Sequence, residues 1–262
     1  MRNALRIFFV GGYISYRALF GFLSLWIFIP TLVLTPIFQI LLFAYIGRAA
    51  GGHSDQFYVV GNAIQYSSVP CLFAMTQTIA EERFWQTLGP LLISPAGRLP
   101  LFLGRALPVI ANGLVVAAFS LFAGGLILGV TLAGADWARL APVLLVAAFS
   151  CTGLGLVNAA IGLRVRETAV LSNVFVGILL IFSGANVPLS ELPGWMADIG
   201  RALPLTHGIE AARAVASGHS LASVRGLLGR EALIGVAYSV GGFFLIRFFE
   251  VQSRRHASLE RV

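Results

Sequence analysis

The chain has 262 residues, of which 58% are apolar and only 11% are charged, and its mean hydropathy is +0.87. Soluble domains carry about 25% charged residues, so this chain has too little polar surface to cover a soluble fold. The composition predicts an integral membrane protein and excludes a soluble enzyme, a secreted disulfide scaffold and a disordered chain.

The basic residues narrow the function further, because all 18 are arginine and the formal net charge is +7. Without lysine the chain cannot contain a G-x-x-x-x-G-K-[ST] phosphate loop, so any ATP that drives it is hydrolysed on another chain. The arginines lie at the ends of apolar runs, which is typical of membrane orientation signals and not of nucleic-acid binding. Cys71 and Cys151 lie inside apolar runs and are interpreted as buried thiols, with no metal site and no disulfide.

Residues 1–17 form the first predicted element. Arg2, Arg6 and Arg17 fall within about 60° of a helical wheel, beside an apolar cluster, which predicts a helix lying along the membrane surface. The alternative is charged flanking sequence before the first span. The apolar run that follows is too long for a cleavable signal peptide.

Six charge-free runs follow this segment. A helix needs roughly 20 apolar residues to cross about 30 Å of hydrocarbon, and the first five runs are long enough. The sixth is shorter, but Phe248 and Phe249 extend it and Arg247 can reach the interface. The runs are Ala18–Gly47, Phe57–Ala80, Ala106–Ala135, Leu140–Leu163, Thr168–Ser190 and Ala232–Ile246.

These runs predict one all-α, polytopic membrane domain over residues 1–262. Its expected parts are the surface helix (1–17), spans 1–2 (18–80), an inner loop (81–105), spans 3–5 (106–187), a long outer loop (188–230), span 6 (231–250) and a tail (251–262). When both termini are placed in the cytoplasm, twelve arginines lie inside, two lie in the short outer loops and four lie in the long outer loop, so we predict that orientation.

The second span is the most polar. Its uncharged polar residues share one side of the helix, and amides in hydrocarbon must find partners, so this side faces either a neighbouring helix or a substrate path. In the fifth span Asn173 shares a face with Gly177 and Gly184. The candidate substrate path therefore comprises Asn62, Gln65, Thr76 and Asn173.

The inner loop opens with the acidic pair Glu81 and Glu82 and the base Arg83, followed by an amphipathic stretch. Leucines recur there at helix-face spacing, and a Ser-Pro turn and another arginine follow. Such a segment either docks in a cleft of a partner or is a solvated turn with an interfacial helix. Its remaining candidate residues are Thr87, Leu88, Leu91, Leu92, Ser94, Pro95 and Arg98.

In the outer loop Gly208, Ala212 and Ala216 recur every four residues, which permits close helix packing. Glu210 and Arg213 are spaced to pair on one turn. A nucleophile needs a base oriented by a third group, and no such arrangement occurs, so His207 is interpreted as a capping or packing residue. An ion-coupled carrier needs ionisable residues inside its spans, and the middle of each span has none.

Two segments resemble the membrane subunits of ABC exporters. The inner loop carries Glu82-Arg83, Thr87-Leu88, Leu91-Leu92, Ser94-Pro95, Arg98 and Gly104-Arg105, and the outer loop carries Leu203-Pro204-Leu205-Thr206-His207, then Arg213 and Gly218. In this order the motifs resemble ABC-2 type exporter permeases, in the daunorubicin-resistance and nodulation-type branch. One departure is Trp85-Gln86, where the family usually has a small residue.

The resemblance implies a function and a set of partners. Glu81 to Leu92 would form a coupling helix in a groove of a separate cytoplasmic ABC ATPase, which alone binds ATP and Mg²⁺; this chain would have no cofactor and no catalytic activity. Two permease subunits would pair, as a homodimer, in the bacterial inner membrane. Short re-entrant helices would lie in the outer loop, and the signature there is Pro204, Leu205, Thr206, His207 and Arg213.

The expected cargo is hydrophobic or amphipathic, either drug-like or lipid-linked, because Phe outnumbers Tyr and Trp and no charge lines the spans. A polysaccharide or glycolipid exporter is the nearest alternative. An ion-coupled secondary transporter is a further one.

Overall fold

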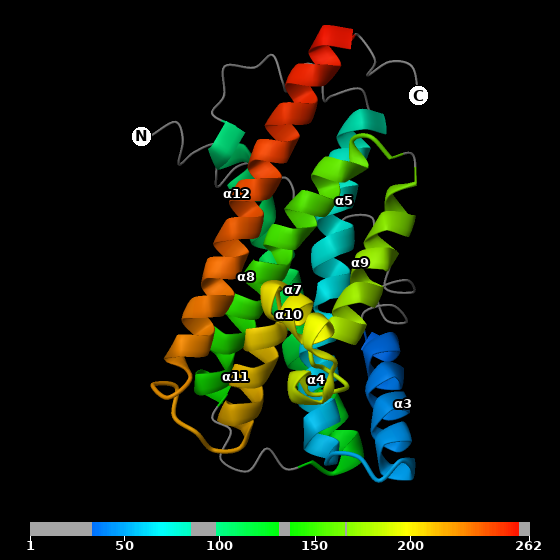
Figure 1. Cartoon of the computed structure of the whole chain (residues 1–262), viewed down its shortest axis with the longest axis vertical. Coiled ribbons are helices and arrows are strands. Elements are labelled where there is room, and N and C mark those ends of the chain that lie inside the picture. Colours follow the sequence, from blue (N-terminus) through cyan, green and yellow to red (C-terminus); the bar gives the residue numbers. More distant parts are fainter. Residues whose placement is uncertain (1–32, 85–97, 131–136, 166, 257–262) are drawn as a thin grey trace.

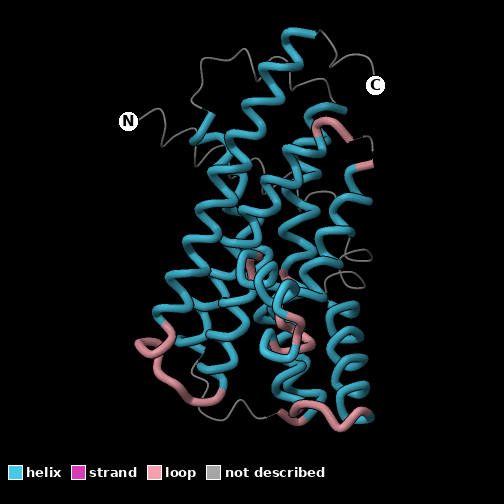
Figure 2. The backbone as a smooth tube through the Cα atoms, in the orientation of Figure 1, coloured by secondary structure: helices cyan, strands magenta, loops and turns pink. Residues whose placement is uncertain are grey.

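The computed structural model describes residues 33–84, 98–130, 137–165 and 167–256. In these ranges the chain is helical, with no strand, as the sequence predicts (Figures 1 and 2). The helices are α3 (Thr35–Ala49), α4 (Asp55–Tyr66), α5 (Ser68–Phe84), α7 (Arg98–Leu128), α8 (Trp137–Gly162), α9 (Thr168–Phe182), η2 (Leu189–Glu191), α10 (Gly194–Ala202), α11 (Thr206–Ala216) and α12 (Arg225–His256).

Three of these helices are long and apolar enough to cross a membrane: Gly104–Leu128 in α7, Trp137–Gly162 in α8 and Arg225–Phe249 in α12. They coincide with the third, fourth and sixth predicted spans. The apolar helices α3 and α9, in the first and fifth predicted spans, have 15 residues each, and the described part of the first span begins at residue 33. The count of six spans stays a prediction.

The second predicted span consists of two helices that meet at Ser67. Pro70, in the first turn of α5, has no N–H to donate to the carbonyl of Tyr66, so a continuous helix would lose a hydrogen bond at this point. The Ser67 hydroxyl donates to the carbonyl of Ile64 over 2.6 Å. The break therefore leaves α4 free to follow a different direction from α5.

The helix α8 lies at the centre of the bundle and packs against α5, α7, α11 and α12. Its contact with α12 depends on glycine, since a Cβ on Gly153 would come within 2.6 Å of the carbonyl oxygen of Gly235. A Cβ on Gly235 would meet the backbone of Ser150 at 2.8 Å. The main chains of α8 and α12 thus approach each other directly, as small residues allow between membrane helices.

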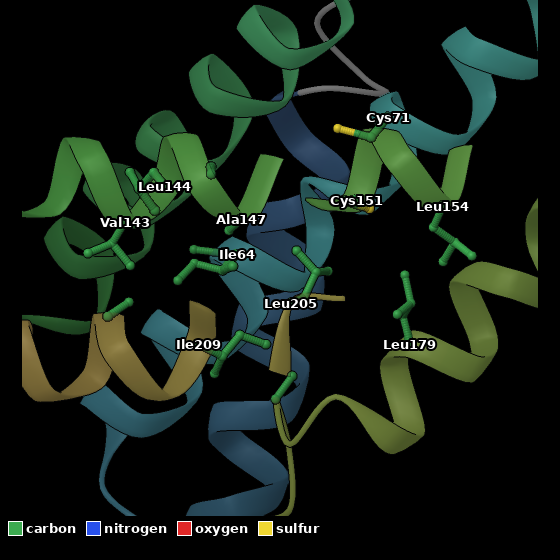
Figure 3. Packing of buried hydrophobic residues seen from close by; sticks show 14 of the residues in the cluster. Ile64, Cys71, Val143, Leu144, Ala147, Cys151, Leu154, Leu179, Leu205 and Ile209 are labelled. Carbon is green, nitrogen blue, oxygen red and sulfur yellow. The ribbon is translucent and has the colours of Figure 1, made fainter. Parts of the chain in front are cut away.

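The core is a single apolar cluster to which α4, α8, α9 and α11 all contribute. Figure 3 shows Ile64, Ala147, Leu205 and Ile209 gathered at its centre. Cys71 and Cys151 lie in the same cluster as buried, free thiols, as the sequence predicts.

The polypeptide re-enters the bundle after α9. Figure 1 shows that α9 ends near mid-height and that α10 and α11 fill the half of the bundle that lies below it. This half also contains the α3–α4 turn and the loop between α11 and α12, and we call it the α11 half. The opposite end holds the ends of α5 and α12 and the turn between α8 and α9.

The glycine contact between α8 and α12 can be tested. Gly235→Val should lower the melting temperature of the purified protein by several degrees, because overpacking a tight contact costs about 1–3 kcal/mol. Gly241→Val is the matched control on the same helix, since a Cβ on Gly241 meets no atom within 4 Å. Thermal unfolding in detergent, followed by size-exclusion fluorescence, checks this; equal melting temperatures for the two variants would contradict it.

Candidate functional site

The first turn of α11 has an unusual backbone. Leu205 precedes it with a φ of 75°, a left-handed conformation that bulky side chains rarely adopt. The Leu205 side chain is fully buried against Ile64 and Ile209 in the core (Figure 3). Next to it, the hydroxyl of Thr206 donates to the carbonyl of Gly200 over 2.7 Å and ties the end of α10 to the start of α11. Burial and hydrogen bonding together hold a conformation that is unfavourable for leucine on its own.

The carboxylate of Glu231, on α12, binds this turn. It accepts hydrogen bonds from the backbone N–H of Leu205 over 2.7 Å and of Gly208 over 3.1 Å, and from the hydroxyl of Ser150 on α8. The side chain is fully buried. A helix N-terminus leaves its first N–H groups without partners inside the helix, and a negative charge there is favourable. Glu231 therefore caps α11 from a different helix.

Sequence reasoning did not find this role of Glu231. The residue follows Arg230 at the edge of the sixth span, where an acidic side chain is ordinarily a flanking charge. The sequence signal that could have indicated burial of Glu231 was its position directly before the apolar run from Ala232 to Ile246. His207 is buried beside the carboxylate, as expected of a packing residue.

Arg213 holds the other side of α11. Its guanidinium donates to the carbonyl oxygens of Gly184 (2.8 Å), Ala185 (2.7 Å) and Phe57 (3.1 Å). It also lies 3.4 Å from the centroid of the Phe57 ring, a cation–π contact. Glu210, which the sequence suggested as its partner, is exposed, and Arg213 makes these hydrogen bonds to main-chain oxygens. Arg213 thus links α11 to α4 and to the segment after α9.

The contact between Arg213 and α4 is possible because residue 61 is glycine. A Cβ at this position would lie 2.3 Å from the carbonyl oxygen of Ala185 and 2.4 Å from the Arg213 guanidinium. The guanidinium and the main chain at Ala185 therefore occupy the space that a side chain on α4 would fill. Burial lowers the pKa of Arg213 to about 9, which leaves it protonated at neutral pH.

A salt bridge stabilises the nearby turn between α3 and α4. Arg48 donates to Asp55 at the start of α4, with the Nε–Oδ1 pair 2.8 Å apart, and this hydrogen bond lowers the pKa of the Asp55 carboxyl. His53 in the same turn stacks on Phe57 with ring centroids 4.4 Å apart. The turn therefore supports the ring on which Arg213 lies.

Asn62 and Gln65 meet in one buried cluster of amides. The Gln39 amide on α3 donates to Asn62 over 3.0 Å and to Gln65 over 2.6 Å, and Asn62 donates to Asn186 over 2.9 Å. The Nε2 atom of Gln65 is buried without a hydrogen-bond partner in the described part of the chain. Gln39 and Asn186 escaped sequence reasoning because each is a single amide with no helical pattern around it. We call these four residues the amide cluster.

Thr76 and Asn173 lie elsewhere. Thr76 is buried in a second cluster, where Asn158 of α8 donates to it over 2.8 Å and to Ser172 of α9 over 2.7 Å. Asn173 is exposed on α9 and donates to the carbonyl of Ala169. The structure thus brings two of the four candidate path residues together and separates the other two from them.

The structure describes only the two ends of the predicted inner loop. Glu81, Glu82 and Arg83 lie in the last turn of α5, and Arg98 is the first residue of α7. The helix α7 therefore begins inside the loop predicted for 81–105. Thr87, Leu88, Leu91, Leu92, Ser94 and Pro95 lie outside the described residues, as does the surface helix predicted for 1–17.

The chemistry of these groups is binding and positioning. Within the described ranges, no three His, Cys, Asp or Glu side chains group as metal ligands would. The side chains of Glu231, which is fully buried, and of Arg213, which is half-buried, both bind main-chain groups at or near α11. The site is an arrangement that holds a short helix within a bundle of longer ones.

Comparison with known families gives one match. The model of the family described as ABC-2 type transporter matches residues 7–216, which includes α3 to α11. The curated proteins contain no match to the chain.

The cap of α11 generates a stability prediction. Glu231→Ala should lower the melting temperature strongly, because it leaves two N–H groups buried without an acceptor, at about 1–3 kcal/mol each. Glu231→Gln keeps one acceptor oxygen and should fall between Glu231→Ala and the unchanged protein. Glu210→Ala removes an exposed carboxylate of the same segment and is the control. If the Glu231→Ala and Glu210→Ala variants have the same melting temperature, the capping role assigned to Glu231 is wrong.

Proposed function

The chain belongs to the ABC-2 type transporter family, and on that premise we propose that it is the permease subunit of an ATP-driven exporter for hydrophobic or amphipathic compounds. The family match over residues 7–216 is the observation that carries this proposal. A family member of this kind is a multi-pass membrane protein and a transport subunit that is not itself catalytic. The three apolar helices α7, α8 and α12 agree with this.

The energy source in this proposal is a separate cytoplasmic ATPase that holds ATP and Mg²⁺. The absence of lysine supports this, since a phosphate-binding loop needs one. The coupling segment would be Glu81 to Leu92, with Glu82 and Arg83 in polar contact with the ATPase. Because α5 ends at Phe84, these two residues stand where the bundle leads into that segment.

The proposed orientation places both termini on the cytoplasmic side of a bacterial inner membrane. The turns α3–α4 and α11–α12 lie together at the α11 half, and the ends of α5 and α12 lie at the opposite end (Figure 1). Arginines concentrate in the segments of that opposite end, which supports a cytoplasmic location for it. The α11 half would then face outward, with α10 and α11 as the re-entrant helices.

A second copy of the permease is proposed to pack against α9. Asn173 is exposed on this helix, and Gly177 has no atom within 4 Å of its Cβ position. An amide beside a small residue suits contact with another helix better than contact with lipid. Between its terminal arginines, α12 exposes the large apolar side chains of Leu233, Val240, Phe244 and Phe248, which suit lipid.

The amide cluster is proposed to be the polar binding site along the cargo path. Gln65 has a buried N–H₂ group that finds no acceptor among the described residues, and this group can donate to an acceptor oxygen of a cargo molecule. The remaining hydrogen bonds of the cluster join α3, α4 and the segment after α9, so it also has a structural role. A path with one cluster of amides in apolar surroundings favours amphipathic compounds over polysaccharides.

The coupling proposal predicts an uncoupled variant. Glu82→Ala with Arg83→Ala should abolish transport in membrane vesicles, because the docking contacts are lost, while the protein still inserts and purifies. Glu210→Ala with Arg225→Ala removes an exposed acid and base from the α11 half and is the matched control. Affinity purification with mass spectrometry identifies the ATPase that accompanies each variant. Normal transport by the Glu82–Arg83 variant would sink the coupling assignment.

The path proposal predicts a change in cargo preference. Gln65→Leu should reduce transport of cargo that carries hydrogen-bond acceptors more than transport of purely apolar dyes, since only the former use the amide. Asn158→Leu, in the other buried cluster, should affect both alike through stability. Competition between cargo classes in vesicles measures the ratio, and a ratio that Gln65→Leu leaves unchanged would make the amide cluster purely structural.

A further inference from the structure

The helix α11 is held on two sides by bonds of different strength. On one side the Glu231 carboxylate joins its first turn to α12 and α8. On the other side Arg213, in its second half, joins it to α4 and to the segment after α9. A movement of α11 within the bundle must break one of these attachments before the other.

The attachment at Glu231 resists separation. The Glu231 carboxyl group is fully buried and accepts hydrogen bonds from Leu205, Gly208 and Ser150, so parting from α11 would leave its oxygens without these main-chain donors in an apolar interior. A fully buried face supports it: Ala147 of α8 lies directly under Gly208, with 3.1 Å between its Cβ and the Cβ position of the glycine. The helices α8 and α12 are themselves in close contact through Gly153 and Gly235.

The hydrogen bonds of Arg213 are easier to replace by hydrogen bonds to water. The residue is half-buried, and its partners are three neutral main-chain carbonyls, which water can replace as acceptors of a guanidinium. At Gly61 the opposing surface of α4 is bare main chain, against which the guanidinium packs. We call the contact between Arg213 and the carbonyls of Phe57, Gly184 and Ala185 the arginine seam.

We infer that α11 moves together with α8 and α12, and that the arginine seam is the place where the α11 half opens to admit water and release cargo. This inference rests on the proposed transport function. It assigns Arg213 the role of a positioning residue that closes the seam, and Glu231 the role of the fixed attachment.

Two buried alanines report on the two sides of α11. Ala185 lies in the arginine seam and Ala147 lies under the fixed side, and both are fully buried. Each is replaced by cysteine in turn (Ala185→Cys, Ala147→Cys) in the full chain within its membrane. A charged, membrane-impermeant thiol reagent then measures the water accessibility of each. Cys71 and Cys151 are buried, so the unchanged protein supplies the background labelling.

The first arm needs no nucleotide. Arg213→Gln should raise the labelling rate of Ala185→Cys by about tenfold, because the charge-assisted bonds that close the seam are lost. It should leave Ala147→Cys protected. Equal increases at both positions, or none at Ala185→Cys, would overturn the inference.

The second arm uses the complex with its ATPase. Trapping with ATP and vanadate should expose Ala185→Cys while Ala147→Cys stays protected, and exposure of Ala147→Cys instead would overturn the assignment of the fixed side. If no ATPase accompanies the chain, the proposed function fails, and the first arm still decides whether the seam opens.

Discussion

A main-chain N–H or C=O in an apolar interior must have a partner, and the α11 half of this protein is organised by that requirement. The chain departs from regular helix at Leu205 and after the end of α9, and each departure leaves polar backbone groups within the bundle. Glu231 accepts from the N–H groups at Leu205 and Gly208, and Arg213 donates to the carbonyls of Gly184 and Ala185. The side chains of Glu231 and Arg213 thus allow the short helix α11 to exist inside the fold.

The same rule explains the remaining polar positions. The amides of Gln39, Asn62 and Gln65 satisfy one another across α3 and α4, and Asn158 bridges α5, α8 and α9 through Thr76 and Ser172. Where side chains are absent, main chains pack directly, as between Gly153 and Gly235. Polar clusters and glycine contacts therefore determine, together with the apolar core, which helices are neighbours.

Composition and hydrophobic runs were sufficient to predict a helical membrane protein, because a charge-free apolar run of about 20 residues is typical of a transmembrane helix. The run over 57–80 did not reveal that Ser67 divides it into two helices, since the cause is one missing N–H at Pro70. Burial of Asn62 and Gln65 followed from their shared helix face, whereas Gln39 and Asn186 approach from other segments and carry no periodic signal. Glu231 was missed for a similar reason: a charge beside a span looks like a flanking residue until the helix it caps is placed next to it.

The position of Glu231 in the chain has a consequence for how the protein is made. The helix α11 is synthesised before α12, so its N-terminal N–H groups leave the ribosome before the carboxylate that will accept from them. The carbonyls that receive Arg213 precede it, and that attachment is available as soon as α11 emerges. The N-terminal cap of α11 can therefore form only after α12 has been synthesised, which makes the final packing of the α11 half a late event in biogenesis.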